Sequence, residues 1–569
     1  MLAYLPGHWY DPQCSSTKET QDKTIILEYK LTKDPSLEIN PTRNQGTNLV
    51  DKHVRPSALN MIQNNSQVSI GEDKRFPKPL PDSEGYVVEF EGADDPEHPQ
   101  NWRLSIKLFN SILVCSGTLI VSLTSAIFSP GITKASKEFG VATEIGTLGT
   151  TLYVLGFAPG PLIWAPASEL RGRKWPLTIG IIVGGIFTVS SAVANNIQTL
   201  IICRFFAGVC GASQLTVVPG VLADSYNNAT RGAAISLYAL TVFVGPFMAP
   251  FLGGFIVSSH LGWRWTLYLP AILSLVNGVL SVLFLGETYP PCILAAKAAR
   301  LRKDCENRGI HARQEEVEIQ FADLVEKYFT RPVKLLFFEP IILVVSIYMS
   351  FIYGLVYALL VAYPFVFENV YGMTPAISGL MFIGLIIGVL LACAFILYGQ
   401  LTYARKMAEN NGIPVPEWRL APTLLGAPIF TIGLFWQVQY LRLSNWCRKT
   451  NDAVGLAGLD SPLKSTGLYP LRLVYSLALG CYAYSFRASI ISLILICRFH
   501  SAASAVAANI MLRSAVAAGF PLFSEQIFQN MGVQWAGTLL GCLAAIMIPI
   551  PIIFRAYGPW LRGKSRIFK

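Results

Sequence analysis

Residues 108–130 read LFNSILVCSGTLIVSLTSAIFSP, without one Asp, Glu, Lys or Arg. A helix of about 20 apolar residues crosses the hydrocarbon layer of a membrane, which is about 30 Å thick. Apolar stretches of similar length recur along the chain, at 145–166, 176–194, 199–222, 232–258, 266–286, 340–366, 376–399, 421–440, 501–523 and 533–554, with a weaker one at 468–497. The sequence therefore predicts an all-α membrane protein with twelve transmembrane helices.

The composition agrees with this prediction. Of the 569 residues, 52% are hydrophobic and only 14% are charged, whereas a soluble domain has about 25% charged residues. The eleven cysteines and six histidines are scattered, without a CxxC or HExxH pattern. We therefore expect no disulfide framework, no metal and no cofactor. No Walker phosphate-binding motif occurs, which argues against transport driven by a nucleotide.

Six apolar stretches, a charged segment and six more stretches are typical of a transporter built from two six-helix bundles. Residues 1–104 are polar and indicate a disordered N-terminal tail. The predicted bundles occupy 105–286 and 339–557, separated by a hydrophilic loop at 287–338 and followed by a short tail at 558–569. We expect a monomer embedded in a lipid bilayer.

The positions of Lys and Arg predict the orientation. They gather after the second and eighth stretches, in the central loop and at the C-terminus, and are missing from 195–198, 367–375 and 524–532. Loops rich in Lys and Arg stay in the cytosol, so both termini and the central loop should be cytosolic. This bias accounts for the net charge of +10 without nucleic acid as a partner.

A charged turn separates the second and third stretches, where residues 165–174 read APASELRGRK. Glu169 and Arg173 are four residues apart and would face each other on one helical turn. Gly172 permits the tight reversal that a short loop between two membrane helices requires. The alternative is a generic basic turn without a further role.

This turn resembles the loop signature of the major facilitator superfamily, in which an acid is followed by Gly and two basic residues. Several other segments resemble the fungal drug:proton antiporter branch with twelve spans (DHA1-type): residues 94–102, DDPEHPQNW; 155–166, LGFAPGPLIWAP; 263–265, WRW; 297–303, KAARLRK; 338–340, FEP; 416–420, PEWRL; and 549–551, PIP. The resemblance implies the major-facilitator fold, a small-molecule substrate and protons as the coupling ion.

The resemblance also implies roles for individual residues. A cytosolic charge latch would comprise Glu169, Gly172, Arg173, Lys174, Asp224 and Arg231. Arg204 lies about 7 Å inside the fourth stretch and matches the family's fourth-helix arginine, which is associated with proton coupling. A charge at that depth needs water, a partner or the bundle interior. A snorkelling interfacial arginine is the alternative.

The fifth stretch carries two stripes with a period of four residues. Gly245, Ala249 and Gly253 form one stripe, which would let another helix approach closely. The other stripe contains Pro246, Pro250 and Gly254, and its prolines break the helical hydrogen bonds. The segment resembles the family's antiporter motif, and the alternative is an ordinary kinked packing helix.

The substrate cavity should lie between the bundles near the middle of the membrane. The candidate lining residues are mostly aromatic: Phe128, Tyr153, Gln214, Tyr353, Tyr357, Phe365, Asn509 and Phe520. Aromatic rings suit flat ligands, although each of these side chains could simply pack. No Asp or Glu falls near the middle of a clear span, so polyamines are less attractive substrates than uncharged or weakly charged aromatic molecules.

Residues 437–500 break the pattern. The family would place its tenth helix here, but this segment has several arginines, including Arg472 and Arg487, and does not resemble the branch. The predicted tenth helix is therefore irregular. A frameshifted or mis-spliced segment and genuine divergence are both open explanations.

The sequence thus predicts a proton-coupled exporter of drugs, toxins or secondary metabolites that works by alternating access, and not an enzyme. The plasma membrane is the expected location, with the vacuolar membrane as the alternative. The rival hypothesis is an inactive transporter relative that binds a ligand without moving it, and it rests on the irregular segment 437–500.

Overall fold

Long helices dominate the computed structural model of the chain. It describes residues 86–92, 94–304, 309–315, 330–364, 367–368, 372–410, 426, 428–433, 435, 502–550 and 552–553. Contacts divide the chain into two units, Met1–Val87 and Val88–Lys569, and every helix below belongs to the second unit.

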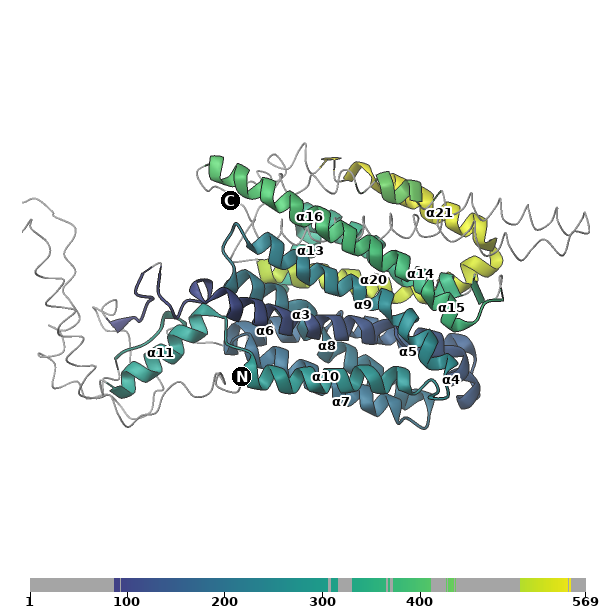
Figure 1. The fold of residues 1–569 in the computed structure, drawn as a ribbon, viewed down its shortest axis with the longest axis horizontal. Helices are drawn as coiled ribbons and strands as arrows, with labels where there is room; N and C mark the ends of the chain where they lie inside the picture. The colour runs from purple at the N-terminus through teal and green to yellow at the C-terminus, as the bar shows by residue number, and fades with distance from the viewer. Residues whose placement is uncertain are drawn as a thin grey trace, which may run out of the picture. The chain divides into compact units, whose positions relative to one another are not determined.

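The helices of the N-terminal half lie side by side (Figure 1). Their bounds are α3 Leu104–Ala126, α4 Ile132–Phe139, α5 Thr143–Gly156, α6 Gly160–Arg171, α7 Lys174–Ala192, α8 Ile197–Ser225, α9 Arg231–Ser258 and α10 Trp265–Phe284. Single-turn helices occur at η2 Pro99–Asn101 and η3 Ser129–Gly131. Helix α8 packs against α5 and α7, and α3 packs against α9 and α10.

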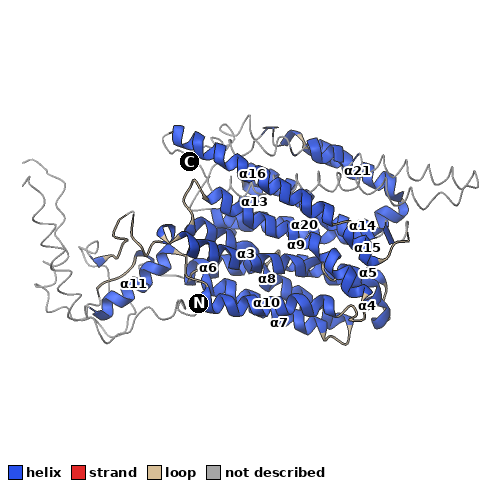
Figure 2. Ribbon diagram, in the orientation of Figure 1, coloured by secondary structure: helices blue, strands red, loops and turns tan. Residues whose placement is uncertain are grey.

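The C-terminal half follows a connecting segment that contains α11 Pro290–Asp304 and η4 Arg313–Glu315. Its helices are α13 Arg331–Phe338, α14 Pro340–Pro364, α15 Pro375–Leu380, α16 Ile383–Glu409, α20 Ala502–Asn530 and α21 Gly532–Met547. Helices α14 and α20 pack against each other. Figure 2 shows that helices joined by loops make up the described part of the chain. The halves meet where α9 packs against α15 and α16 and where α20 packs against α5.

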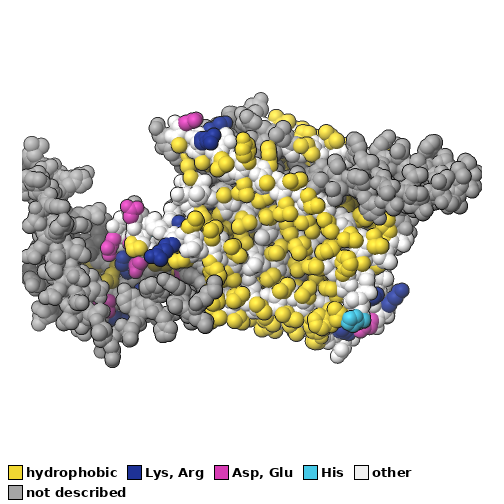
Figure 3. Space-filling model, viewed as in Figure 1, with side chains coloured by type: hydrophobic (Ala, Val, Ile, Leu, Met, Phe, Trp, Pro, Cys, Tyr) yellow, Lys and Arg dark blue, Asp and Glu magenta, His cyan; other side chains and the backbone are white. Residues whose placement is uncertain are grey.

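Nine helical spans in the described part of the chain are long and apolar enough to cross a membrane, and α21 is a shorter apolar helix. Large apolar side chains stay exposed along the helices, among them Ile112, Ile186, Val279, Leu391 and Ile546. In Figure 3 they cover the body of the helices, and the charged side chains gather at the two ends. This is the surface that a helix bundle presents to lipid.

The predicted spans agree with the helices wherever both are described. The span expected at 468–497 lies outside the described residues, and the one at 421–440 is described only at 426, 428–433 and 435. Within the described residues the structure therefore accounts for an all-helical membrane fold but not for twelve spans.

The disordered tail was expected to extend to residue 104, but the residues just before α3 have a defined structure. Asp95 is buried, and its carboxylate accepts hydrogen bonds from the backbone N–H groups of Glu91 and Glu97, at 3.0 and 2.8 Å. Lys297 of α11 also lies 3.6 Å from the Asp95 carboxylate. These contacts give a defined structure to the residues just before α3, because two backbone hydrogen bonds and one ion pair hold the carboxylate.

Candidate functional site

The charged turn lies between α6 and α7. Helix α6 ends at Arg171, and Gly172 has a φ of +87°, which favours glycine. The sequence placed Glu169 and Arg173 on one helical turn, but the helix is interrupted between them. Arg173 instead turns towards α8, where its Nε lies 3.1 Å from Oδ2 of Asp224. The guanidinium also donates to Ser168 at 2.9 Å.

Glu287, just after α10, holds the same turn from the other side. Its carboxylate accepts hydrogen bonds from the backbone N–H groups of Arg173 at 2.8 Å and Lys174 at 3.1 Å. A carboxylate at this position satisfies free N–H groups at the start of α7 and complements the helix dipole. A Cβ atom at Gly172 would collide with Glu287. Sequence reasoning missed this role of Glu287.

The other expected latch residues surround this pair. Arg231 begins α9, is buried, and lies near enough to Asp224 for their charges to interact. The Nζ of Lys174 lies 6.0 Å from the centre of the Trp175 ring. The backbone oxygen of Glu169 accepts a hydrogen bond from Gln314 at 3.2 Å. Arg173 and Asp224 thus form an ion pair at this end of the helices, which we call the Arg173 end.

Arg204 lies in α8 and is completely buried. Its Nε donates to the backbone oxygen of Gly149 at 2.9 Å, and Nη1 donates to that of Thr124 at 2.9 Å. A third, longer bond joins Nη2 to the backbone oxygen of Ser125 at 3.3 Å. The guanidinium also stacks 4.5 Å from the ring centre of Tyr153. Arg204 therefore does not snorkel, because the protein itself supplies its acceptors.

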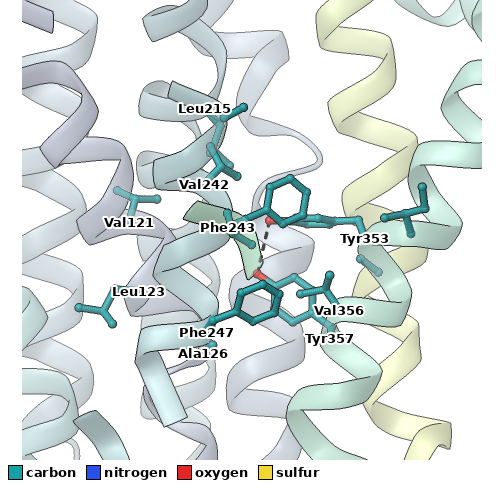
Figure 4. Packing of buried hydrophobic residues seen from close by; sticks show 14 of the residues in the cluster. Val121, Leu123, Ala126, Leu215, Val242, Phe243, Phe247, Tyr353, Val356 and Tyr357 are labelled. Carbon is teal, nitrogen blue, oxygen red and sulfur yellow. Dashed lines mark hydrogen bonds between the residues drawn. The ribbon is translucent and has the colours of Figure 1, made fainter. Parts of the chain in front are cut away.

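A polar contact next to Arg204 crosses from one half to the other. The hydroxyl of Ser125, at the end of α3, lies 2.8 Å from the hydroxyl of Tyr357 in α14. The Tyr357 hydroxyl is in turn 3.5 Å from that of Tyr353, one helical turn earlier (Figure 4). Both tyrosines are buried in the same apolar cluster as Phe243 and Phe247 of α9. Because these hydroxyls are buried, breaking the hydrogen bond without replacing it with another is unfavourable.

The two stripes of α9 face different halves. A Cβ atom at Gly245 would collide with Ser122 and Leu123 of α3, and one at Gly253 would collide with the backbone oxygen of Ile127. The glycine stripe thus permits close packing within the N-terminal half. Ala249, between them, is fully buried.

The second stripe of α9 faces the C-terminal half. A Cβ atom at Gly254 would collide with the backbone oxygen of Pro375 in α15. In the same contact, a Cβ atom at Gly379 would lie 2.6 Å from the backbone oxygen of Pro250. Pro246 is also buried. At the end opposite to Arg173, the halves therefore touch backbone to backbone.

The structure brings four of the candidate cavity residues together, Phe128, Tyr153, Tyr353 and Tyr357, because Tyr153 lies near Tyr353 and Arg204 lies near Phe128 and Tyr357. Phe128 and Tyr153 pack around Arg204, and Tyr353 and Tyr357 lie between the halves. Gln214 donates to the backbone oxygen of Leu177 inside the N-terminal half. Asn509 and Phe520 lie on α20, and Phe365 lies outside the described residues.

Sequence reasoning missed one charged residue of this region. Arg513 lies in α20 and is buried, with its guanidinium 4.1 Å from the ring centre of Tyr353. The signal that singled out Arg204, a basic residue inside an apolar stretch, applied equally to Arg513.

Comparison with known proteins places this geometry in a family. The model of the Major Facilitator Superfamily matches residues 114–448, so the match ends inside the irregular segment 437–500. The proton:xylose symporter XylE has the same fold, with a TM-score of 0.54 at 15% identity, over 80% of this chain and 96% of that one.

Curated relatives are closer in sequence. The multidrug transporter TPO1_2 of Candida glabrata is 41% identical over 87% of this chain and 82% of its own length. The citrinin biosynthesis cluster transporter mrr1 of Monascus ruber is 40% identical over 84% and 92%. The multidrug transporter FLU1 of Candida albicans is 38% identical over 87% and 78%. On its sequence and its fold, this chain belongs to the major facilitator superfamily.

Proposed function

We propose that this chain is a secondary active exporter of small organic molecules, driven by exchange for protons and working by alternating access between its two halves. The relatives named above as multidrug transporters and as a transporter of a secondary-metabolite cluster support this proposal. We also propose a plasma-membrane location. The positive-inside bias supports cytosolic termini and puts the Arg173 end in the cytosol.

The observation that carries the proposal is the kind of contact that joins the halves. Backbone packing of α9 on α15 closes one end, and the Ser125–Tyr357 hydrogen bond lies deeper. At the Arg173 end, Gly232 of α9 approaches the side chain of Gln400 in α16. None of these contacts belongs to the interior of a single half, so they can break while each half stays folded. Alternating access requires such an interface.

The buried charges have separate roles in this proposal. The Arg173–Asp224 pair, with Glu287 behind it, holds the cytosolic ends of α6, α7 and α8 in place as the gate moves. Arg204 cannot release a proton at physiological pH, because an arginine side chain stays charged. It instead acts in coupling as a positioning residue, fixing the end of α3 and thereby the Ser125 hydroxyl that reaches Tyr357.

The test is export in a defined membrane. The purified chain is reconstituted into proteoliposomes, and efflux of a fluorescent aromatic dye is followed with a proton gradient, with the gradient collapsed by a protonophore, and without protein. We expect efflux that stops with the protonophore. Efflux that ignores the gradient would refute proton exchange. Dye binding without any flux would refute transport and favour a ligand-binding relative.

A further inference from the structure

Arg513 lies about 17 Å along α20 from its first residue, close to the middle of the span. Its side chain is only 2% exposed, and its Nε and Nη2 atoms have no hydrogen-bond partner. A charge at this depth is unfavourable by several kcal/mol unless something compensates it. Since arginine does not lose its proton here, the positive charge remains.

The groups around Arg513 are polar and aromatic. Asn509 lies one helical turn earlier. Neither its Oδ1 atom nor the hydroxyl of Ser514, which follows Arg513, has a hydrogen-bond partner. The ring of Tyr353 covers the guanidinium at 4.1 Å. About two turns further on, the Phe520 ring packs on Gly354 of α14. This face of α20 therefore combines unused hydrogen-bonding groups with flat apolar surfaces.

The surroundings of Arg513 belong to the interface between the halves. Helix α20 packs against α14 in its own half and against α5 of the other half. Tyr353, which covers Arg513, is bonded through Tyr357 to Ser125 of α3. None of the ion pairs among the described residues involves Arg513, so an anion bound at this interface would supply the acceptor that its Nε and Nη2 atoms lack.

We propose that Arg513 binds the anionic group of the transported molecule, and that the preferred substrates are aromatic compounds bearing one carboxylate, sulfonate or similar delocalised anion. A guanidinium presents two parallel N–H groups that match such an anion. Tyr353 and Phe520 flank the attached ring. A phospholipid headgroup stays at the membrane surface, so the ligand is a free organic anion. This inference rests on the proposed export function and names its substrate class.

Three probes that share a naphthalene ring test the proposal. They are naphthalene-2-sulfonate, the neutral naphthalene-2-sulfonamide and the cationic (naphthalen-2-ylmethyl)trimethylammonium. Binding to the purified full chain is measured by the rise in unfolding temperature with probe concentration. The wild type should bind the sulfonate at least about tenfold more tightly than the sulfonamide, because only the sulfonate completes a charged hydrogen-bonded pair.

Two variants test whether Arg513 causes the preference for the sulfonate. Arg513→Gln should bind the sulfonate about as weakly as the sulfonamide, whereas Arg513→Lys should keep part of the preference, because it keeps the charge but not the fork. An Arg513→Gln variant that folds and still prefers the sulfonate would overturn the proposal. If that variant does not fold, the wild type decides, since equal binding of the three probes, or a preference for the cation, would also overturn it.

Different results would refute the export function and the Arg513 binding site. Proteoliposomes that show no gradient-driven flux, although sulfonate binding depends on Arg513, would refute export and leave the binding site standing. Gradient-driven dye efflux that is unchanged in Arg513→Gln, together with a lack of sulfonate preference, would refute the binding site and leave export standing.

Discussion

Arg204 and Arg513 are both buried in the membrane-spanning region, one in each half of the molecule, and both lie against a tyrosine ring. Arg204 donates to three backbone oxygens. Arg513 has two nitrogen atoms, Nε and Nη2, without an acceptor. Two buried arginines therefore differ in their hydrogen bonding: the protein satisfies Arg204 but leaves part of the Arg513 guanidinium unpaired.

The difference indicates that the Arg204 charge stabilises the fold, whereas the Arg513 charge destabilises it. A buried arginine that the backbone satisfies helps to fix the helices around it, here α3, α5 and α8. An unsatisfied one costs free energy in the empty protein and recovers it only when an acceptor arrives. Functional sites often carry such a cost. Between the two arginines, the Ser125–Tyr357 contact marks the line along which the halves would part.

The largest effect should come from preventing the halves from parting. Gly232 and Gln400 approach each other across the interface at the Arg173 end, so Gly232→Cys with Gln400→Cys should form a disulfide on oxidation. We expect nearly complete loss of dye efflux, restored by reducing agent. The single variants Gly232→Cys and Gln400→Cys, oxidised in the same way, are the controls. Full efflux by the cross-linked protein would show that this end does not open.

Arg173 provides a third case, an arginine paired with an acid. Asp224→Asn removes the charge 3.1 Å from Nε and leaves a largely buried cation without its partner. Breaking a buried pair in this way lowers the free energy of unfolding by about 3 kcal/mol. The double variant Asp224→Asn/Arg173→Met should recover part of that loss. Chemical unfolding in detergent measures both, and an unaffected Asp224→Asn protein would mean that the pair is weak.

The contact between the two arginines should have a smaller effect. Tyr357→Phe and Ser125→Ala each remove one side of the hydrogen bond across the halves. A double-mutant cycle of unfolding free energies should give a coupling of about 1 kcal/mol. Tyr348→Phe, in the same helix, serves as the comparison variant. A coupling near zero would place the two hydroxyls apart in the folded protein.

The smallest effect should come from the pair outside the membrane. The backbone N–H of Glu91 holds the pKa of Asp95 below its ordinary value of 3.8, with further lowering by Glu97 and Lys297. A lowered pKa stabilises the fold above the unfolded value and loses this effect as the pH falls through the folded value. Stability should therefore not change through Asp95 between pH 7.5 and 5.

Lys297→Met, which removes the ammonium near Asp95, should cost less than about 1 kcal/mol at either pH. Unfolding free energies at pH 7.5 and 5 measure this. A cost that appears at pH 7.5 and vanishes by pH 5 would mean that Asp95 titrates above its ordinary range.

Much of the fold could be predicted from the sequence, because long uncharged stretches leave few alternatives to membrane helices. The site was harder to predict. Periodicity separated the two stripes of the fifth span but did not assign them to different halves, since that depends on which helices become neighbours. The pairing of Arg173 depended on the break at Gly172. The unpaired Nε and Nη2 atoms of Arg513 depended on how its side chain lies among its neighbours, which a sequence pattern does not give.

The most direct test of the contrast between the two arginines is the stability of Arg204→Met and Arg513→Met without any ligand. Both substitutions replace a buried arginine with an apolar side chain of similar length. We predict that Arg204→Met unfolds at a clearly lower temperature than the wild type, because hydrogen bonds to a charged donor, each contributing about 1.5–3 kcal/mol, are lost. Arg513→Met should unfold at the same or a higher temperature. Equal destabilisation by the two substitutions would contradict the account, because Arg513 would then be a structural residue like Arg204.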